Sequence, residues 1–164
     1  VHGEHGWDVG DLDGSNARHR LTRRLYRPFV TRYVALSRHI QDYLQSSIGV
    51  PADAIAQIYN GVDTARYSRT VGTRAPIIGS PFNESSAWLI GTVGRLAAVK
   101  DQAGLIRAVA SACSASTEAS KRLRLVIVGD GPLMGELKEV ARAEGVTDRI
   151  WFAGSRDDVA QVLA

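Results

Sequence analysis

The sequence has very little cysteine: Cys113 is the only one among 164 residues. A single cysteine excludes a disulfide framework and a paired-cysteine zinc site, and it favours a reducing compartment. No apolar run approaches the length that spans a bilayer. The chain begins at Val1, without methionine or a signal-peptide pattern. We therefore expect a cytoplasmic protein and a chain that is a fragment of a longer one.

Several familiar catalytic motifs are also absent. The chain has no Ser-His-Asp set, no phosphate loop of the nucleotide-triphosphatase kind, no internal repeat and no low-complexity tract. The net charge of +3, from 20 basic and 17 acidic residues, is too small to indicate nucleic acid. With 45% hydrophobic and 23% charged residues, the composition is that of a globular protein.

The excess of basic residues is concentrated in one stretch. Six arginines and no acidic residue lie between Arg18 and Arg32. A solvated helix face is the simplest explanation. Contact with an anionic membrane is the alternative, because about 1 kcal/mol per basic residue accumulates near anionic headgroups. Few aromatic residues are interleaved for base stacking, so we expect no nucleic-acid partner.

The first part of the chain predicts two helices between short strands. One helix spans 15–33, is interrupted by Pro28 and is expected to bury three apolar residues, Leu21, Leu25 and Phe29. The next begins at the N-cap Ser37 and ends at Gly49. Its apolar residues recur at four-residue steps, namely Ile40, Leu44 and Ile48. Strands are predicted at 33–36 and 55–59.

The rest of the chain predicts a parallel sheet. Residues rich in Thr, Gly, Pro, Ser and Asn indicate a linker over 65–87, which separates domains at 1–64 and 88–164. Beyond the linker, strands and helices alternate, which is typical of an α/β fold with right-handed crossovers. The strands are predicted at 88–93, 123–128 and 149–153, and the helices at 101–113, at 132–144 and from Asp157.

Two cations follow the first of these strands, at Arg95 and Lys100. Ligands of open α/β sheets bind at the carboxyl ends of strands. Arginine can grip phosphate oxygens in a bidentate manner, and lysine adds a mobile point charge. The pair therefore indicates a diphosphate site. The alternative is that Arg95 pairs with a surface carboxylate and that Lys100 is a solvated residue at a helix start; spacing alone leaves both open.

Other motifs are weaker. Gly129 and Gly131 open a helix as in a dinucleotide-binding loop, but Met134 occupies the place of the third glycine. A tight strand-to-helix turn explains these glycines more simply. The cluster of His2, Glu4 and His5 is weak evidence for zinc, because it has no helix and no further ligands around it. The pair Asp11 and Asp13 resembles a metal-binding Asp-x-Asp, but helix capping is the simpler explanation. We expect no metal ion and no cofactor.

The order of these signals closely resembles glycosyltransferase family 4, the retaining enzymes of the two-domain GT-B fold. The resemblance rests on Ile-Tyr-Asn-Gly-Val-Asp at 58–63, on the stretch from Ile90 to Asp101 and on Val-Gly-Asp-Gly-Pro at 128–132. The opening His-Gly-Glu-His-Gly and residues 11–32 look most like sugar transferases of bacterial exopolysaccharide loci. The fold implied is the end of an amino-terminal Rossmann-like domain and the first half of a carboxy-terminal one.

The resemblance also implies roles for individual residues. Arg95 and Lys100 would bind the donor diphosphate and stabilise its charge without a metal, and Gly94 would let the backbone approach the phosphates. His2 would reach the donor sugar, and Arg156 would lie where the family holds the nucleotide base. The family's second signature, two glutamates eight positions apart, should follow Ala164. Without it we expect the chain alone to be inactive.

The implied activity is transfer of a hexose from a UDP- or GDP-sugar to a lipid-linked or polysaccharide acceptor, at the inner face of the membrane. One alternative is a non-catalytic nucleotide- or anion-binding module that uses the same cations. A dinucleotide oxidoreductase that binds NAD near Gly129 is a third hypothesis.

Overall fold

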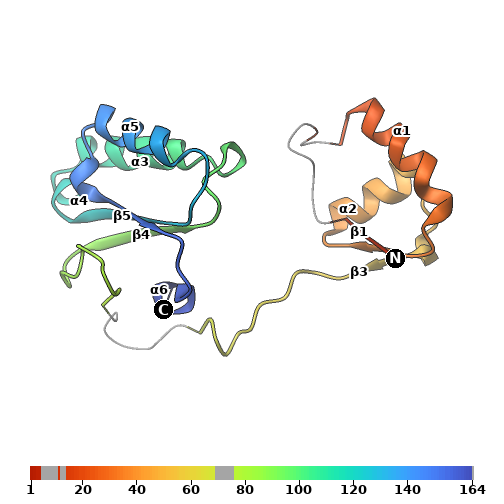
Figure 1. Cartoon of the computed structure of the whole chain (residues 1–164), viewed down its shortest axis with the longest axis horizontal. Helices are drawn as coiled ribbons and strands as arrows, with labels where there is room; N and C mark the ends of the chain where they lie inside the picture. Colours follow the sequence, from red (N-terminus) through yellow and green to blue (C-terminus); the bar gives the residue numbers. More distant parts are fainter. Residues whose placement is uncertain (5–10, 12–13, 69–75, 164) are drawn as a thin grey trace. The chain divides into compact units, whose positions relative to one another are not determined.

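The computed structural model describes residues 1–4, 11, 14–68 and 76–163. The chain divides into two compact units, Val1–Val62 and Asp63–Ala164. Each unit contains its own three-stranded parallel sheet (Figure 1). The α/β expectation is therefore confirmed, whereas the domain limits 1–64, 65–87 and 88–164 stay a prediction.

The sheet of the first unit follows chain order and is formed by β1 (His2–Glu4), β2 (Tyr33–Ala35) and β3 (Ile55–Gln57). Its helices are α1 (Ala17–Tyr26), a 3-10 turn (Arg27–Phe29), α2 (Arg38–Tyr43), a π-helical turn (Leu44–Ile48) and a second 3-10 turn (Ala52–Ala54). The predicted helix over 15–33 is thus shorter than expected. It changes to a 3-10 turn at Pro28, whose ring is incompatible with a helix interior.

The core of the first unit lies between its sheet and α2. The Ser37 side chain accepts a hydrogen bond from the Ile40 amide at 3.2 Å, as the N-cap prediction requires. Gly49 ends the helical segment in the left-handed conformation, with φ of 81°. These two ends direct one face of the segment inward, and the buried core is formed by Tyr33, Ala35, Ile40, Tyr43, Leu44, Ile48 and Val50.

The prediction for the buried face of α1 was wrong. The side chains expected to point inward, Leu21, Leu25 and Phe29, are 59%, 67% and 88% exposed. Arg23 is buried instead, because it forms an ion pair with the buried Glu4 at the end of β1. A carboxylate removed from water needs a counter-charge, and this requirement orients the helix.

The sheet of the second unit is formed by β4 (Trp88–Val93), β5 (Leu123–Val128) and β6 (Ile150–Gly154). Its helices are α3 (Gln102–Ala115), α4 (Thr117–Arg122), α5 (Met134–Ala143) and α6 (Val159–Leu163), and 3-10 turns lie at Ala98–Lys100 and Thr147–Arg149. The strands and three of the helices agree with the predictions to within a few residues. Helix α4 was not predicted.

Side chains of β5 alternate between two apolar layers. Leu125 and Ile127 are fully buried against α3 and α5, which cover one face of the sheet (Figure 1). Val126 and Val128 point to the opposite face, where they contact α6 and Phe82. Phe82 and Ile77 are only 6% and 9% exposed, so the part of the predicted linker around these two residues packs on the second unit.

In the described part of the chain, no helix is long and apolar enough to cross a membrane. Cys113 is half-buried on α3, where its thiol lies 3.8 Å from the carbonyl oxygen of Ala119.

Candidate functional site

The two candidate cations lie on a loop that is fixed by backbone hydrogen bonds. The amide of Gly94 donates to the carbonyl of Val128 at 2.9 Å, and the amide of Leu96 donates to the carbonyl of Asp130 at 3.0 Å. The Leu96 side chain is fully buried in the core. This anchor leaves Arg95 exposed at the carboxyl end of β4, where ligands of parallel sheets bind.

Gly129 and Gly131 allow the loop after β5 to lie directly against the loop that carries Arg95. A Cβ atom at Gly129 would come within 2.0 Å of the Gly94 carbonyl oxygen, and one at Gly131 within 2.4 Å of the Leu96 carbonyl oxygen. Both glycines are therefore required for contact between two loops, which the tight-turn interpretation did not include. The Gly131 amide donates to its neighbour Asp130 at 2.7 Å, so that amide is already engaged.

Lys100 and Asp101 have separate tasks. The Cε atom of Lys100 lies 3.9 Å from where a Gly94 Cβ would be, so the lysine stem passes close to Gly94. Asp101 takes the left-handed conformation, with φ of 46°, and its carboxylate accepts from the Gly104 amide at 3.1 Å. Asp101 therefore caps α3.

Within residues 76–163, neither Arg95 nor Lys100 has an ion-pair partner, in contrast to several other arginines of this unit. The paired arginines are Arg107 with Glu144, Arg122 with Glu118, Arg142 with Glu139 and Arg156 with Asp158. The alternative that Arg95 is held by a surface carboxylate is therefore not what the described residues show. Two exposed charges without counter-ions at one strand end can bind an anion.

Gln102 was missed by the sequence analysis. Its side chain is 2% exposed, and its Nε2 donates to the Arg95 carbonyl at 3.1 Å. The Gln102 side chain thus holds the backbone of the candidate phosphate loop at Arg95. In the sequence, the one signal for this role is that Gln102 directly follows Asp101. The contact itself joins Gln102 to Arg95, seven positions earlier, which no local pattern indicates.

Arg156 is engaged by its own neighbours. Its Nε and Nη2 atoms donate to the two carboxylate oxygens of Asp158 at 2.7 and 2.5 Å, and the guanidinium lies 5.4 Å from the ring centre of Trp151. The hydrogen bonds to Asp158 raise the pKa of Arg156. The pair occupies one hydrogen-bonding edge of the guanidinium, and the role of Arg156 at a nucleotide base stays a prediction.

His2 belongs to the first unit, at the start of β1. Its Nε2 lies 3.1 Å from Oε1 of Glu4. His5 and Asp13, which completed the two weak metal motifs, lie outside the described residues, and Asp11 is 4% exposed. Among the described side chains there is no group of three or more His, Cys, Asp and Glu that could hold a metal.

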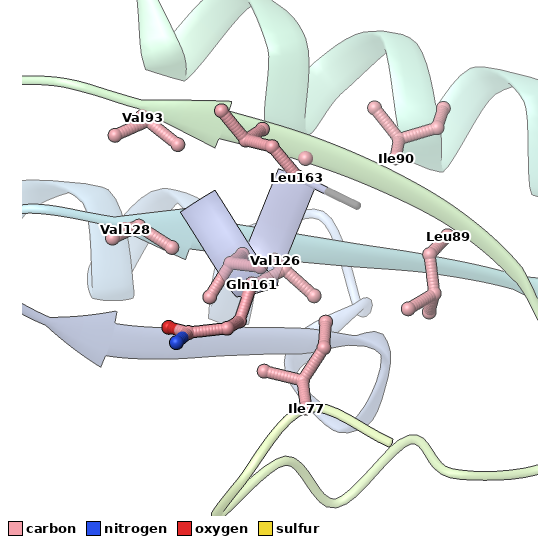
Figure 2. A pocket seen from close by; sticks show the side chains of 10 residues that line it. Ile77, Leu89, Ile90, Val93, Val126, Val128, Gln161 and Leu163 are labelled. Atoms are coloured by element: carbon pink, nitrogen blue, oxygen red, sulfur yellow. The ribbon is translucent and has the colours of Figure 1, made fainter. Parts of the chain in front are cut away.

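A cavity of about 270 Å³ lies on the sheet face of the second unit that carries α6 (Figure 2). Among the described residues, its lining is almost entirely apolar and comes from β4, β5, α6 and the segment before β4, with Gln161 as the one polar side chain. Since it offers no positive charge, this cavity is unsuited to a diphosphate.

Comparison with known proteins finds similarity to glycosyltransferases in both parts of the chain. Residues 1–66 match the family described as Glycosyltransferase Family 4, and residues 87–164 match the family described as Glycosyl transferases group 1. A putative glycosyltransferase of Bacillus subtilis, EpsF, is 25% identical over 163 residues, which are 97% of this chain and 41% of EpsF.

Solved structures give the same answer for the fold. Anabaena HepE, crystallised with UDP and glucose, has a TM-score of 0.70 and 22% identity over 99% of this chain and 43% of HepE. WaaG, a glycosyltransferase involved in lipopolysaccharide biosynthesis, has a TM-score of 0.68 and 18% identity over 96% of this chain and 45% of WaaG. The expected GT-B fold is confirmed. The chain spans 41% and 43% of the lengths of EpsF and HepE.

Proposed function

We propose that this chain is part of a glycosyltransferase that takes its sugar from a nucleotide diphosphate sugar, with Arg95 and Lys100 at the donor diphosphate. One observation carries the proposal: two cations without carboxylate partners among the described residues lie on a loop held in place by the neighbouring strand-to-helix loop. The similarity to HepE, whose crystal structures contain UDP and UDP-glucose, supports a nucleotide-sugar donor.

The chemistry follows from where charge develops. When the glycosidic bond breaks, negative charge accumulates on the departing nucleotide diphosphate. Preorganised positive groups stabilise that charge more than they stabilise the intact donor, which lowers the barrier without a metal ion. Arg95 would hold two oxygens at once, and Lys100 would supply the second charge close to Gly94.

The other assigned residues complete the proposal. Gly94 leaves room for a phosphate beside the backbone, His2 contacts the donor sugar, and Arg156 lies near the nucleotide base. We further propose that the reaction retains the configuration of a hexose and uses a lipid-linked or polysaccharide acceptor, as in exopolysaccharide biosynthesis. The similarity to WaaG, which is involved in lipopolysaccharide biosynthesis, supports such an acceptor.

We also propose that the protein works in the cytoplasm, in peripheral contact with an anionic membrane. The exposed side chains of Leu21, Leu25 and Phe29 form an apolar ridge on α1 and the following turn. Arginines flank this ridge, and three of them donate to backbone carbonyls and have no carboxylate partner among the described residues; these are Arg24, Arg27 and Arg32. An apolar ridge with flanking cations is typical of surfaces that bind anionic lipid.

The proposal is tested by replacing the two cations. In the full-length gene product, Arg95→Ala or Lys100→Ala should lower the rate of sugar transfer by about 10²-fold, because each removes a preorganised charge partner of the leaving group. The rate is measured as nucleotide release from UDP-hexose and GDP-mannose. Arg142→Ala is the matched control, since Arg142 is exposed on α5 and pairs with Glu139.

Unchanged sugar transfer in both Arg95→Ala and Lys100→Ala would refute the role of these cations at the donor diphosphate. Nucleotide-sugar binding without transfer to any acceptor would favour the non-catalytic module. Both outcomes are read from the same titration, with binding followed by Trp fluorescence and transfer by nucleotide release. NAD serves as the negative control, because NAD binding would support the oxidoreductase hypothesis.

A further inference from the structure

Glu4 lies at the centre of a polar cluster at the end of β1. The residue is 8% exposed, and its Oε1 atom is reached by three side chains. The Nε2 of His2 lies at 3.1 Å, the Nε of Arg23 at 3.2 Å and the hydroxyl of Tyr26 at 3.3 Å. The partners come from β1 and α1, up to 22 residues apart, so the cluster exists only in the folded unit.

The position of the carboxylate in this cluster is fixed. Arg23 and Glu4 are both 11% exposed at their side chains, and a buried ion pair of this kind is held firmly because separation would leave an unpaired charge. Burial, aided by the nearby charge of Glu4, raises the pKa of Tyr26 to about 12. The phenol therefore keeps its proton and donates to Glu4.

The contacts of the cluster also bear on which nitrogen of the His2 ring carries a proton and on how the ring is oriented. The Nε2 atom lies 3.1 Å from Oε1 of Glu4 and 3.4 Å from the Tyr26 hydroxyl. An ionised carboxylate only accepts hydrogen bonds, so the shorter contact requires a proton on Nε2. The rings of Tyr26 and Tyr33 lie 5.4 and 5.7 Å from the imidazole centre and restrict its rotation. The His2 side chain is still 38% exposed, which leaves Nδ1 as the ring nitrogen available to a substrate.

We propose that Glu4 is a positioning residue, which holds the His2 imidazole in one orientation with Nε2 protonated and leaves Nδ1 for a hydroxyl of the donor sugar. This inference rests on the proposed function, since only there does His2 contact the sugar. It assigns to Glu4 an effect on catalysis that acts entirely through His2. A second-layer carboxylate of this kind commonly fixes the tautomer of a functional histidine.

The direct test of the geometry is NMR on the full-length gene product with ¹⁵N-labelled histidine. The His2 signals are identified by their loss in His2→Ala. We expect Nε2 to be the protonated nitrogen in the wild type and in Tyr26→Phe, which retains the carboxylate. In the double variant Glu4→Leu with Arg23→Met, which removes both buried charges together, the preference for this tautomer should be lost. A wild-type ring protonated only at Nδ1 would overturn the inference.

The functional test is a double-mutant cycle. Glu4→Gln keeps the shape of the side chain but weakens the acceptor, and we expect kcat to fall by about 10-fold to 10²-fold with little change in donor KM, since small misplacements of a reacting group have effects of this size. In a His2→Ala background the same substitution should change nothing further. An equal loss in both backgrounds would show that Glu4 acts by another route and overturn the inference.

The two tests separate the inference from the proposed function. If His2→Ala leaves transfer unchanged, the sugar contact of His2 is refuted, and the inference with it, while Arg95→Ala still tests the donor site. If His2→Ala slows sugar transfer but Glu4→Gln causes an equal further loss in that background, the proposed function stands and only the role of Glu4 is refuted.

Discussion

At the residue scale, the loop that carries Arg95 lies backbone to backbone against the loop after β5. Gly131 has no room for a side chain, because a Cβ atom would lie 2.4 Å from the Leu96 carbonyl oxygen and 2.8 Å from the Leu96 amide nitrogen. Backbone cannot move aside as the end of a flexible side chain can. The loop that carries Arg95 therefore depends on a residue that itself carries no chemistry.

We predict that Gly131→Ala destabilises the second unit by about 1–3 kcal/mol, as expected for overpacking, and also lowers sugar transfer by displacing Arg95. Gly135→Ala is the matched control. A Cβ atom there meets nothing within 4 Å, and alanine in a helix should stabilise by about 0.5–1 kcal/mol. Chemical denaturation measures both variants. Equal free energies of unfolding for Gly131→Ala and Gly135→Ala would show that the two loops make room for the added methyl group without loss of stability.

At the element scale, α3 begins at a strained residue. Asp101 is the only non-glycine residue with positive φ in the described ranges, and its carboxylate caps the Gly104 amide. Asparagine tolerates the left-handed conformation and can cap, whereas alanine does neither. We predict that Asp101→Ala costs about 1.5–4 kcal/mol of stability, the sum of about 0.5–2 kcal/mol for the lost cap and about 1–2 kcal/mol for the strained backbone. Asp101→Asn should stay close to wild type in thermal denaturation, and equal losses in both would contradict the capping role.

Helix α1 carries the proposed membrane contact. We predict that the full-length gene product binds vesicles with anionic lipid, and that binding weakens as salt rises because the arginine charges are screened. Leu25→Ser should weaken binding further, since Leu25 is 67% exposed on the ridge. Val99→Ser, on the 56% exposed Val99 of the second unit, is the control. Vesicle sedimentation measures the effect, and equal binding to neutral vesicles would count against the proposal.

At the scale of the whole molecule, the chain consists of two units, Val1–Val62 and Asp63–Ala164, each with its own sheet and core. Every residue from 58 to 68 is exposed. Exposed segments between compact units are the preferred sites of proteolytic cleavage. We predict that limited trypsin digestion separates the two units, with Arg66 as a cleavage point in this stretch. Mass spectrometry identifies the fragments, and a first cut inside α3 or α5 would contradict the division.

The sequence by itself determined every described strand except β1, the parallel order of the second unit and the candidate phosphate loop. These follow from local patterns: apolar runs of strand length, four-residue steps in helices, and glycine or a capping residue at helix ends, as at Ser37 and Gly49. Arg95 and Lys100 could be selected because their place after a buried strand is itself a local signal. The GT-B fold was likewise accessible from the order of these motifs along the chain.

Only the tertiary structure decided which side chains face one another. The buried face of α1 depends on the ion pair between Glu4 and Arg23, which lies 19 residues away. The spacing of apolar residues in a helix does not indicate that a charged residue will be buried. Gly131 and Leu96 meet because two strands are neighbours in the sheet, and Gln102 reaches Arg95 only after α3 has packed. Such contacts are fixed by long-range packing and by the need to satisfy buried polar groups, which no local pattern specifies.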